Sequence, residues 1–205
     1  MRPVLATALL ASLLLASSST RAQESPPPVA VSPPRWSHRG QGTLRASISE
    51  GYRFAIRYED GPTTADPCDD GNNKFCTGLS PLMLDVALGV GATHSLEFEA
   101  RMRLGLLTDF DGSRPLQFGA GIRTVSDPES PFKFVLGAAI FADVTADRRR
   151  AGGDFDVVLR AEEGVQYDVN RWFGVYGVAG ESFGLLRNFS CIVDLNLGVQ
   201  FRAPP

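Results

Sequence analysis

Residues 96–106 have the sequence LEFEARMRLGL, and this stretch decides the fold. Six apolar side chains alternate in it with four charged side chains and one glycine. Strict alternation of this kind places the apolar side chains on one face of a β-strand and the charged ones on the other. The stretch therefore predicts a strand over about 95–107 with two chemically opposite faces.

The same period of two recurs on both sides of this stretch, and it predicts eight strands separated by turn-rich connections. Their expected ranges are 43–58, 81–91, 95–107, 115–125, 131–145, 154–168, 171–185 and 190–201. Glu163 interrupts the alternation of the sixth strand, so we expect a bulge or an early end there. The phase of the seventh strand is open.

The polar face of these strands contains many glycines and equal numbers of acidic and basic residues. Glycine weakens a strand that faces solvent, whereas inside a narrow barrel it makes room for bulky neighbours. Buried charges also need partners, because an unpaired one costs several kcal/mol. We therefore predict an ion-pair network inside a barrel. Its predicted members are Arg53, Arg57, Asp85, Glu97, Glu99, Arg101, Arg103, Arg123, Lys133, Asp143, Asp156, Arg160, Glu162 and Asp194.

The apolar face has aromatic residues near the strand ends, as in the interfacial girdles of membrane barrels. They are Tyr52, Tyr58, Phe132, Phe155, Trp172 and Phe201. The strands also reach the ~9–11 residues that a tilted membrane-spanning strand needs. The alternative is a soluble exported β-barrel or sandwich, in which the same apolar face turns inward.

The N-terminus has the features of a secretory signal peptide over residues 1–22. Arg2 precedes an apolar run at 4–16, and Thr20 and Ala22 fit the small positions of a cleavage site. No other segment approaches the 18 apolar residues of a membrane-spanning helix. We expect a Pro-rich periplasmic leader at 23–42, a barrel at 43–202 and a short tail at 203–205.

The signal, the eight alternating strands, the alternation of long and short connections, and a last strand ending at Phe201 resemble the small OmpA/OmpX-type outer-membrane barrels. The resemblance implies an all-β fold, an up-and-down antiparallel eight-stranded transmembrane β-barrel. It also implies export to the bacterial outer membrane, contact with its lipid, and insertion by the barrel assembly machinery. One departure is that residues 202–205 follow Phe201, where the family commonly ends on an aromatic residue.

Catalytic groups are scarce in this sequence. The two histidines are His38, in the leader, and His94, which lies in a short turn beside Ser95. Adjacent strand residues face opposite ways, so His94 and Ser95 do not predict a nucleophile and its base. Glu97 and Glu99 share a face with two arginines, which favours ion pairs over acid–base chemistry. We therefore predict no enzyme, no catalytic residues and no cofactor.

The connection before the second strand contains Cys68 and Cys76, separated by seven turn-rich residues. In an exported chain this spacing favours a disulfide, and two unpaired thiols are the alternative. The acidic residues around them do not predict a calcium site. An EF-hand alignment on Gly71 places Cys68 and Thr77 where oxygen ligands are needed, so we expect no metal.

Arg148, Arg149 and Arg150 follow the fifth strand on the predicted outer side. Guanidinium groups bind phosphate in a bidentate manner, so these residues are candidate contacts for lipopolysaccharide, and a solvated basic loop is the alternative. The net charge of −3 gives no signal for nucleic-acid binding.

Together these features predict an integral outer-membrane barrel with a salt-bridged, closed lumen. Its expected role is structural, adhesive or in surface recognition, and its loop partner is not identified by the sequence. The second hypothesis is a soluble exported β-barrel that binds an apolar ligand, and the third is a lipid-modifying barrel enzyme.

Overall fold

A computed structural model describes residues 38–56, 75–108, 114–145, 155–186 and 189–203. The described strands are β1 (Gly42–Ile56), β2 (Phe75–Leu79), β3 (Met83–Gly91), β4 (Leu96–Gly105), β5 (Leu116–Val125), β6 (Phe132–Asp143), β7 (Asp156–Asp168), β8 (Phe173–Gly184) and β9 (Phe189–Ala203). Within these ranges, no helix has the length and apolar character needed to cross a membrane.

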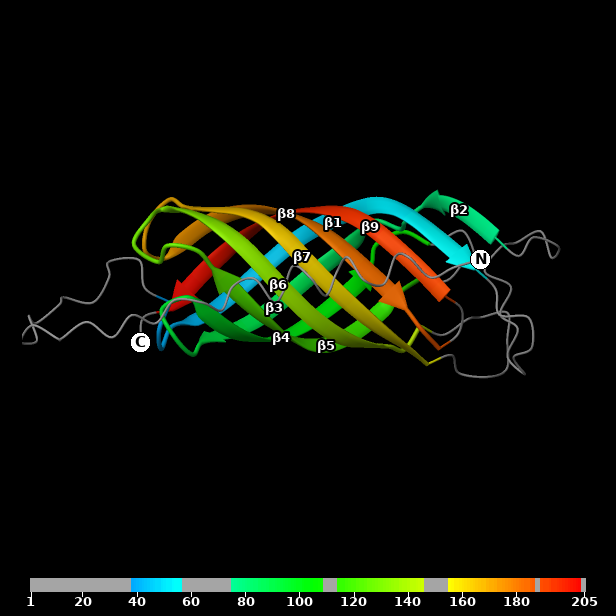
Figure 1. The fold of residues 1–205 in the computed structure, drawn as a ribbon, viewed down its shortest axis with the longest axis horizontal. Helices are drawn as coiled ribbons and strands as arrows, with labels where there is room; N and C mark the ends of the chain where they lie inside the picture. Colours follow the sequence, from blue (N-terminus) through cyan, green and yellow to red (C-terminus); the bar gives the residue numbers. More distant parts are fainter. Residues whose placement is uncertain (1–37, 57–74, 109–113, 146–154, 187–188, 204–205) are drawn as a thin grey trace, which may run out of the picture. The chain divides into compact units, whose positions relative to one another are not determined.

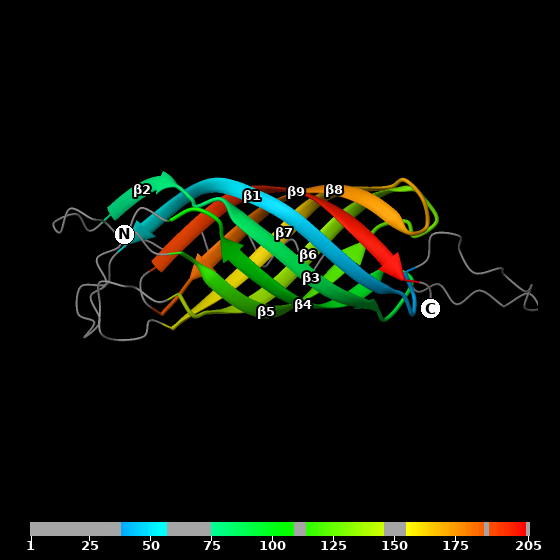
Figure 2. The ribbon, with the colours of Figure 1, turned by 180° about the vertical axis from the view of Figure 1, so that it is seen from behind.

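The strands form one antiparallel sheet that closes on itself (Figure 1). From β3 to β9 each strand pairs with the next one in the chain. Closure comes from β1, which pairs with β3 on one side and with β9 on the other, from Gly42 opposite Ala203 to Ile56 opposite Phe189 (Figure 2). The result is an up-and-down barrel.

Strands β2 and β3 occupy a single position in this barrel. Along β1, Ser49 lies opposite Met83 and Tyr52 lies opposite Leu79, so the partner side has one additional residue between them. This is a β-bulge at residues 80–82, and the backbone N–H of Ser80 donates to the Gly51 carbonyl at 2.9 Å. The closed barrel therefore has eight strands, with β2 extending one of them beyond the bulge.

The predicted strand ranges agree with the structure to within two residues at each end. The expected break at Glu163 is wrong, because β7 keeps continuous register with β6 and β8 past this residue. Glu163 simply lies on the outer face. Strand β2 was not predicted, since its residues were assigned to the connection at 59–80.

The two faces of the barrel wall differ sharply in chemistry. On β9, the outward Leu197 is 73% exposed and its inward neighbour Asn196 is 1% exposed. Apolar side chains that face out around a largely polar interior are the arrangement expected in lipid, and the described interior contains only two small apolar clusters, around Val135 and Phe141. The predicted girdle residues Tyr52, Phe132, Phe155, Trp172 and Phe201 are exposed, whereas Tyr58 is outside the described residues.

The two ends of the barrel also differ. At one end, β1 begins, β9 ends, and short turns at 92–95, 126–131 and 169–172 join neighbouring strands. We call this the short-turn end. At the opposite end the strands are joined by the connections at 57–74, 106–115, 144–155 and 185–188, and we call it the loop end.

Candidate functional site: the charged barrel interior

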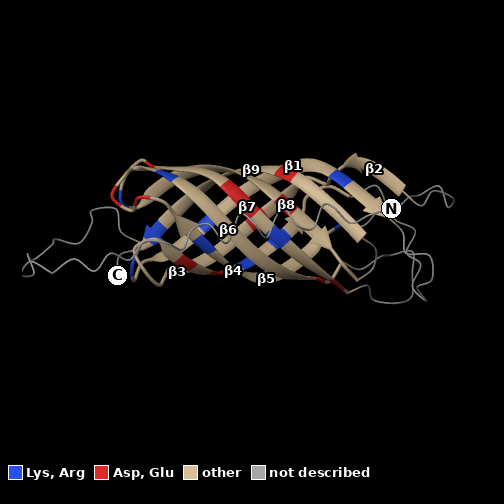
Figure 3. Ribbon diagram, in the orientation of Figure 1, with Lys and Arg blue, Asp and Glu red and all other residues tan. Residues whose placement is uncertain are grey.

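Twelve of the fourteen residues predicted to face the interior are buried there, each at most 9% exposed. They are Asp85, Glu97, Glu99, Arg101, Arg103, Arg123, Lys133, Asp143, Asp156, Arg160, Glu162 and Asp194. Arg53 is half-buried on the inward side of β1, beside β2. Arg57 lies outside the described residues. Figure 3 shows basic and acidic positions on strands around the barrel.

At the centre of the interior, three arginines and three carboxylates alternate in a closed circuit, which we call the central ring. Arg101 contacts Asp85 at 2.6 Å and Glu162 at 2.7 Å. Arg160 contacts Glu162 at 2.7 Å and binds Asp194 through both terminal nitrogens, at 2.6 and 2.8 Å. Arg103 closes the circuit, 3.0 Å from Asp194 and 3.4 Å from Asp85.

The central ring joins strands that are far apart in the sheet. Asp85 and the two arginines of β4 lie on one side, and β7 and β9 supply the other members. Because each guanidinium has five donors and each carboxylate accepts several hydrogen bonds, every charge in the ring has at least two partners of opposite sign. The ring therefore fills the interior and connects opposite walls.

Small residues on facing strands make the space for these arginines. A Cβ added to Gly180 on β8 would overlap the guanidinium of Arg160. A Cβ added to Gly119 on β5 would overlap the ring of Phe141, which itself lies 5.6 Å beneath the guanidinium of Arg101. Glycine is thus required at Gly180 by the approach of the Arg160 side chain, and at Gly119 by the approach of the Ile140 carbonyl and the Phe141 ring.

A second group of charges lies between the central ring and the short-turn end. Arg45 on β1 pairs with Glu99 on β4, and Arg123 on β5 donates to Gln200 at 3.0 Å and Gln166 at 2.9 Å. The ring of Tyr176 lies 5.8 Å from the guanidinium carbon of Arg45 and 5.1 Å from that of Arg123. The aromatic face thus stabilises two like charges that approach one another.

The mouth at the short-turn end is filled by five residues that we call the mouth cluster: His38, Glu97, Lys133, Asp168 and Arg202. His38 is fully buried and contacts Glu97 through Nδ1. Its Nε2 lies 3.0 Å from Nζ of Lys133, which donates to Asp168 at 2.6 Å. Arg202 binds both oxygens of Asp168, at 2.7 and 3.0 Å. The cluster thus forms a continuous chain of hydrogen bonds.

At the loop end, two inward carboxylates accept hydrogen bonds from their surroundings. Asp143 accepts from Gln117 at 3.1 Å and from the hydroxyl of Thr145. Asp156 accepts from the backbone N–H groups of Leu185 and Leu186, at 3.2 and 2.7 Å. These contacts link the start of β5 to the end of β6, and the start of β7 to the end of β8.

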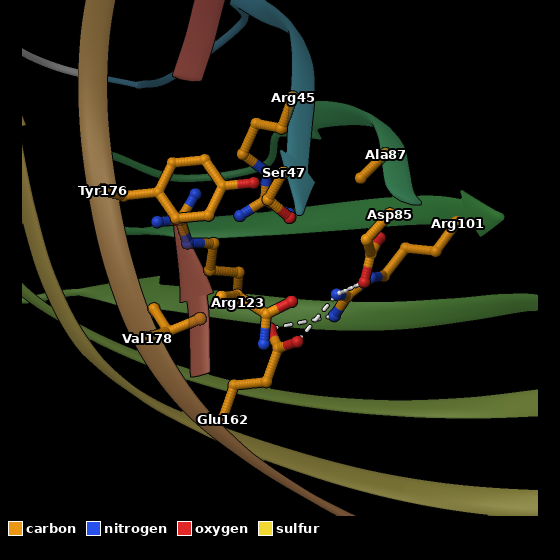
Figure 4. A pocket seen from close by; sticks show the side chains of 10 residues that line it. Arg45, Ser47, Asp85, Ala87, Arg101, Arg123, Glu162, Tyr176 and Val178 are labelled. Carbon is orange, nitrogen blue, oxygen red and sulfur yellow. Dashed lines mark hydrogen bonds and ion pairs between the residues drawn. The ribbon is translucent and has the colours of Figure 1, made fainter. Parts of the chain in front are cut away.

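Between the mouth cluster and the central ring, a cavity of about 10 Å³ remains, lined by residues that include Arg45, Asp85, Arg101, Glu162 and Tyr176 (Figure 4). A space of that size holds about one water molecule. The cavity is therefore too small for an apolar ligand of the kind that a soluble ligand-binding barrel would enclose. Among the described residues, no three histidines, cysteines or acids form a group that could hold a metal ion.

Four titratable members of this interior were absent from the predicted set: His38, Arg45, Asp168 and Arg202. Arg45 lies on the polar face of the first strand, where the alternation alone identifies it. His38, Asp168 and Arg202 were assigned to the leader, a turn and the final residue of the barrel, and no alternation marks them there. His94 and Ser95 lie in the turn between β3 and β4, as expected.

Several predictions fall partly or wholly on residues outside the described ranges. Cys76 on β2 is disulfide-bonded, and Cys191 is a free thiol. Cys68 is not described, so its pairing with Cys76 stays a prediction. The same is true of Arg148, Arg149 and Arg150 as lipopolysaccharide contacts.

Comparison with known proteins supports the fold. No family model matches this sequence, and no curated protein matches it. Among solved structures, Neisserial surface protein A is 14% identical with a TM-score of 0.57, and the match covers 80% of this chain and 99% of that one. The outer membrane protein OprG from Pseudomonas aeruginosa is 12% identical with a TM-score of 0.54, covering 83% and 99%.

The N-terminal β-barrel domain of Pseudomonas aeruginosa OprF is a third match, 10% identical with a TM-score of 0.54, covering 80% and 98% of the two chains. Each match spans almost the whole of the other chain. At such low identity the likeness is one of fold. The chain has the fold of the small eight-stranded outer-membrane β-barrels.

Proposed function

We propose that this chain is a non-enzymatic integral outer-membrane protein with a closed lumen, and that it acts through its loop end in a structural, adhesive or surface-recognition role. The observation that carries the proposal is the central ring of buried ion pairs inside an apolar outer wall. We expect such an interior to leave no continuous water-filled path, and the apolar wall needs lipid around it. The soluble ligand-binding barrel is not favoured, because its apolar face would have to turn inward.

The closed lumen is tested by single-channel recording in planar bilayers with the full chain refolded in detergent. We expect no stable conductance above the baseline, while an unrelated porin in the same bilayers gives large steps. A second measurement verifies folding, since a membrane barrel migrates faster on gels before boiling than after. Stable large conductance from a heat-modifiable sample would contradict the closed lumen.

The partners we propose are outer-membrane lipid, the barrel assembly machinery and, at the loop end, lipopolysaccharide phosphate held by Arg148, Arg149 and Arg150. Replacing all three arginines by glutamine should raise the sensitivity of cells to outer-membrane stress, because bidentate phosphate contacts are lost. Arg171→Gln at the short-turn end is the matched control and should leave sensitivity unchanged. Equal sensitivity of the triple variant and the parent, at equal protein levels, would argue against a lipopolysaccharide contact.

A further inference from the structure

We propose that residues 38–41 form a latch across the short-turn mouth of the barrel, held closed by neutral His38 and released when His38 binds a proton. The latch is built from the mouth cluster and from the backbone around His38. It goes beyond the proposed function, because it concerns the inner mouth of the barrel and not its loops.

The backbone of this segment is docked on the turn that joins β3 to β4. The N–H of Gly40 donates to the Gly91 carbonyl at 2.8 Å, and the N–H of Gln41 donates to the His38 carbonyl at 3.1 Å. Gly40 has a φ of 73°, a left-handed conformation that glycine adopts without strain. The Gly91 backbone packs so closely on the His38 carbonyl that a Cβ at Gly91 would overlap it. The segment is thereby folded into the mouth.

The side chain of His38 lies between a carboxylate and an ammonium group. Lys133 is paired with Asp168 and, as an ammonium, has only donors, so its contact with Nε2 requires that this nitrogen has no proton. The single ring proton then lies on Nδ1 and is donated to Glu97. This geometry assigns His38 as the neutral Nδ1–H tautomer.

A second proton on His38 would break this arrangement. Protonated Nε2 would point an N–H group at the ammonium of Lys133, so a hydrogen bond would be replaced by repulsion between like charges. Other charged groups packed around the mouth are Glu97 of β4, Asp168 of β7, Arg202 of β9, Arg123 of β5 and Arg45 of β1. Asp168 is already paired with Lys133 and Arg202. Glu97 accepts from His38 Nδ1 in either protonation state and also interacts with Arg123 and Arg45.

Burial of His38 also disfavours its protonated form. Loss of hydration lowers the pKa of His38 below its ordinary value of 6.5, although Glu97 acts in the opposite direction; Arg202 and Lys133 lower it further. A released His38 in water keeps a pKa of about 6.5. Between these two values the released state binds more protons than the docked state, so docking weakens as the pH falls. The docking equilibrium should fall by up to about tenfold per pH unit below about 6.5.

The test is hydrogen exchange at the amides of Gly40 and Gln41 in the full chain, folded in detergent micelles, with intrinsic exchange rates corrected at each pH. Protection should be nearly constant from pH 8 to 7 and fall by up to about fivefold between pH 6.5 and 5.5. Core amides of β4 to β7 should show no such change. Constant protection of Gly40 and Gln41 down to pH 5.5 would overturn the proposal.

Two substitutions assign the effect to His38. A glutamine at 38 can donate to Glu97 and accept from Lys133 without titrating, so His38→Gln should show protection that does not change with pH. His94→Gln, which removes the only other histidine, should behave as the parent. A pH response that disappears in His94→Gln, or that is fully retained in His38→Gln, would contradict the proposed latch.

A spectroscopic readout covers the case in which His38→Gln does not fold. In the parent protein, ¹⁵N shifts of the imidazoles should identify His38 as the Nδ1–H tautomer at pH 7.5. They should also show that the pKa of His38 lies below its ordinary value of 6.5. A Nε2–H tautomer for His38 would contradict the geometry on which the latch rests.

Discussion

At the scale of single residues, the packing of the interior depends on the positions at which glycine leaves space for a neighbouring side chain. Gly177 and Gly180 are both on β8, three positions apart, and point to opposite faces. The site of a Cβ at Gly180 is already filled by the guanidinium of Arg160. At Gly177 the nearest atom to an added Cβ is Cδ2 of Leu197, at 3.2 Å, which is the end of a flexible side chain on the outer face.

These two glycines make a matched pair for a stability measurement. Gly180→Ala should lower the free energy of unfolding by about 1–3 kcal/mol, because Arg160 must leave its place in the central ring. Gly177→Ala should change it by less than about 0.5 kcal/mol. Urea unfolding in lipid vesicles measures both. Equal effects of the two substitutions would show that the space beside Arg160 is not limiting.

The same scale shows why the network could be predicted only in part. Alternation along one strand identifies Arg101 and Glu162 as inward residues, and this much needs no structure. Their pairing depends on the register of strands on opposite walls, which no single strand specifies. Asp168 and Arg202 have no alternating neighbours on both sides, so sequence alone assigns them to a turn and to a strand end. His38 lies before the first strand, and only its docking reveals its burial.

At the scale of elements, β7 and β8 differ from β3, β4, β5 and β6 in having acidic residues on the lipid-facing side. Glu163 lies outward between Ala161 and Val165, and Glu181 lies outward between Ala179 and Phe183. Across β3, β4, β5 and β6 no outward residue is charged. The sequence suggested a break at Glu163, since a charge in an apolar row normally ends a strand; the continuous ladder to both neighbours holds the strand together despite it.

Outward and inward glutamates on β7 should therefore respond oppositely to the same change. Glu163→Leu should raise the free energy of unfolding in lipid vesicles by up to about 2 kcal/mol, because a carboxyl group leaves the hydrocarbon region. Glu162→Leu should lower it by about 3–5 kcal/mol, because Arg101 and Arg160 each lose a buried partner. A loss of stability in Glu163→Leu comparable to that in Glu162→Leu would mean that Glu163 has a structural partner.

Strand β2 shows the limit of sequence patterns at this scale. Its five residues follow a turn-rich segment and precede Ser80 and Pro81, which are typical of a connection. The bulge at 80–82 shifts the register by one residue, so the alternation of β2 is out of phase with that of β3. A pattern that changes phase is not recognised as one strand. The eight main strands lack such a shift, and seven of them were predicted with their correct faces; the phase of the strand at 171–185, which is β8, was left open.

At the scale of the whole molecule, the central ring and the outer wall impose complementary requirements. The ring can form only when strands on both sides of the barrel are in place, because its members come from β3, β4, β7 and β9. The apolar wall needs lipid on all sides. Neither is satisfied in a partial barrel, so interior filling and membrane insertion should be lost together when either is disturbed.

The seam between β1 and β9 has a consequence for the order of folding events. Its fifteen residue pairs join the first strand to the last, and Gly42 meets Ala203. Such a contact forms only after the intervening chain has been made and held in place, and contacts so distant in sequence close slowly. Until then every growing barrel has two open edges, β1 and its newest strand, each able to pair with a foreign strand. The topology therefore requires that both edges be protected until the last strand, which ends at Ala203, has paired with β1. This requirement does not depend on the role of the loops.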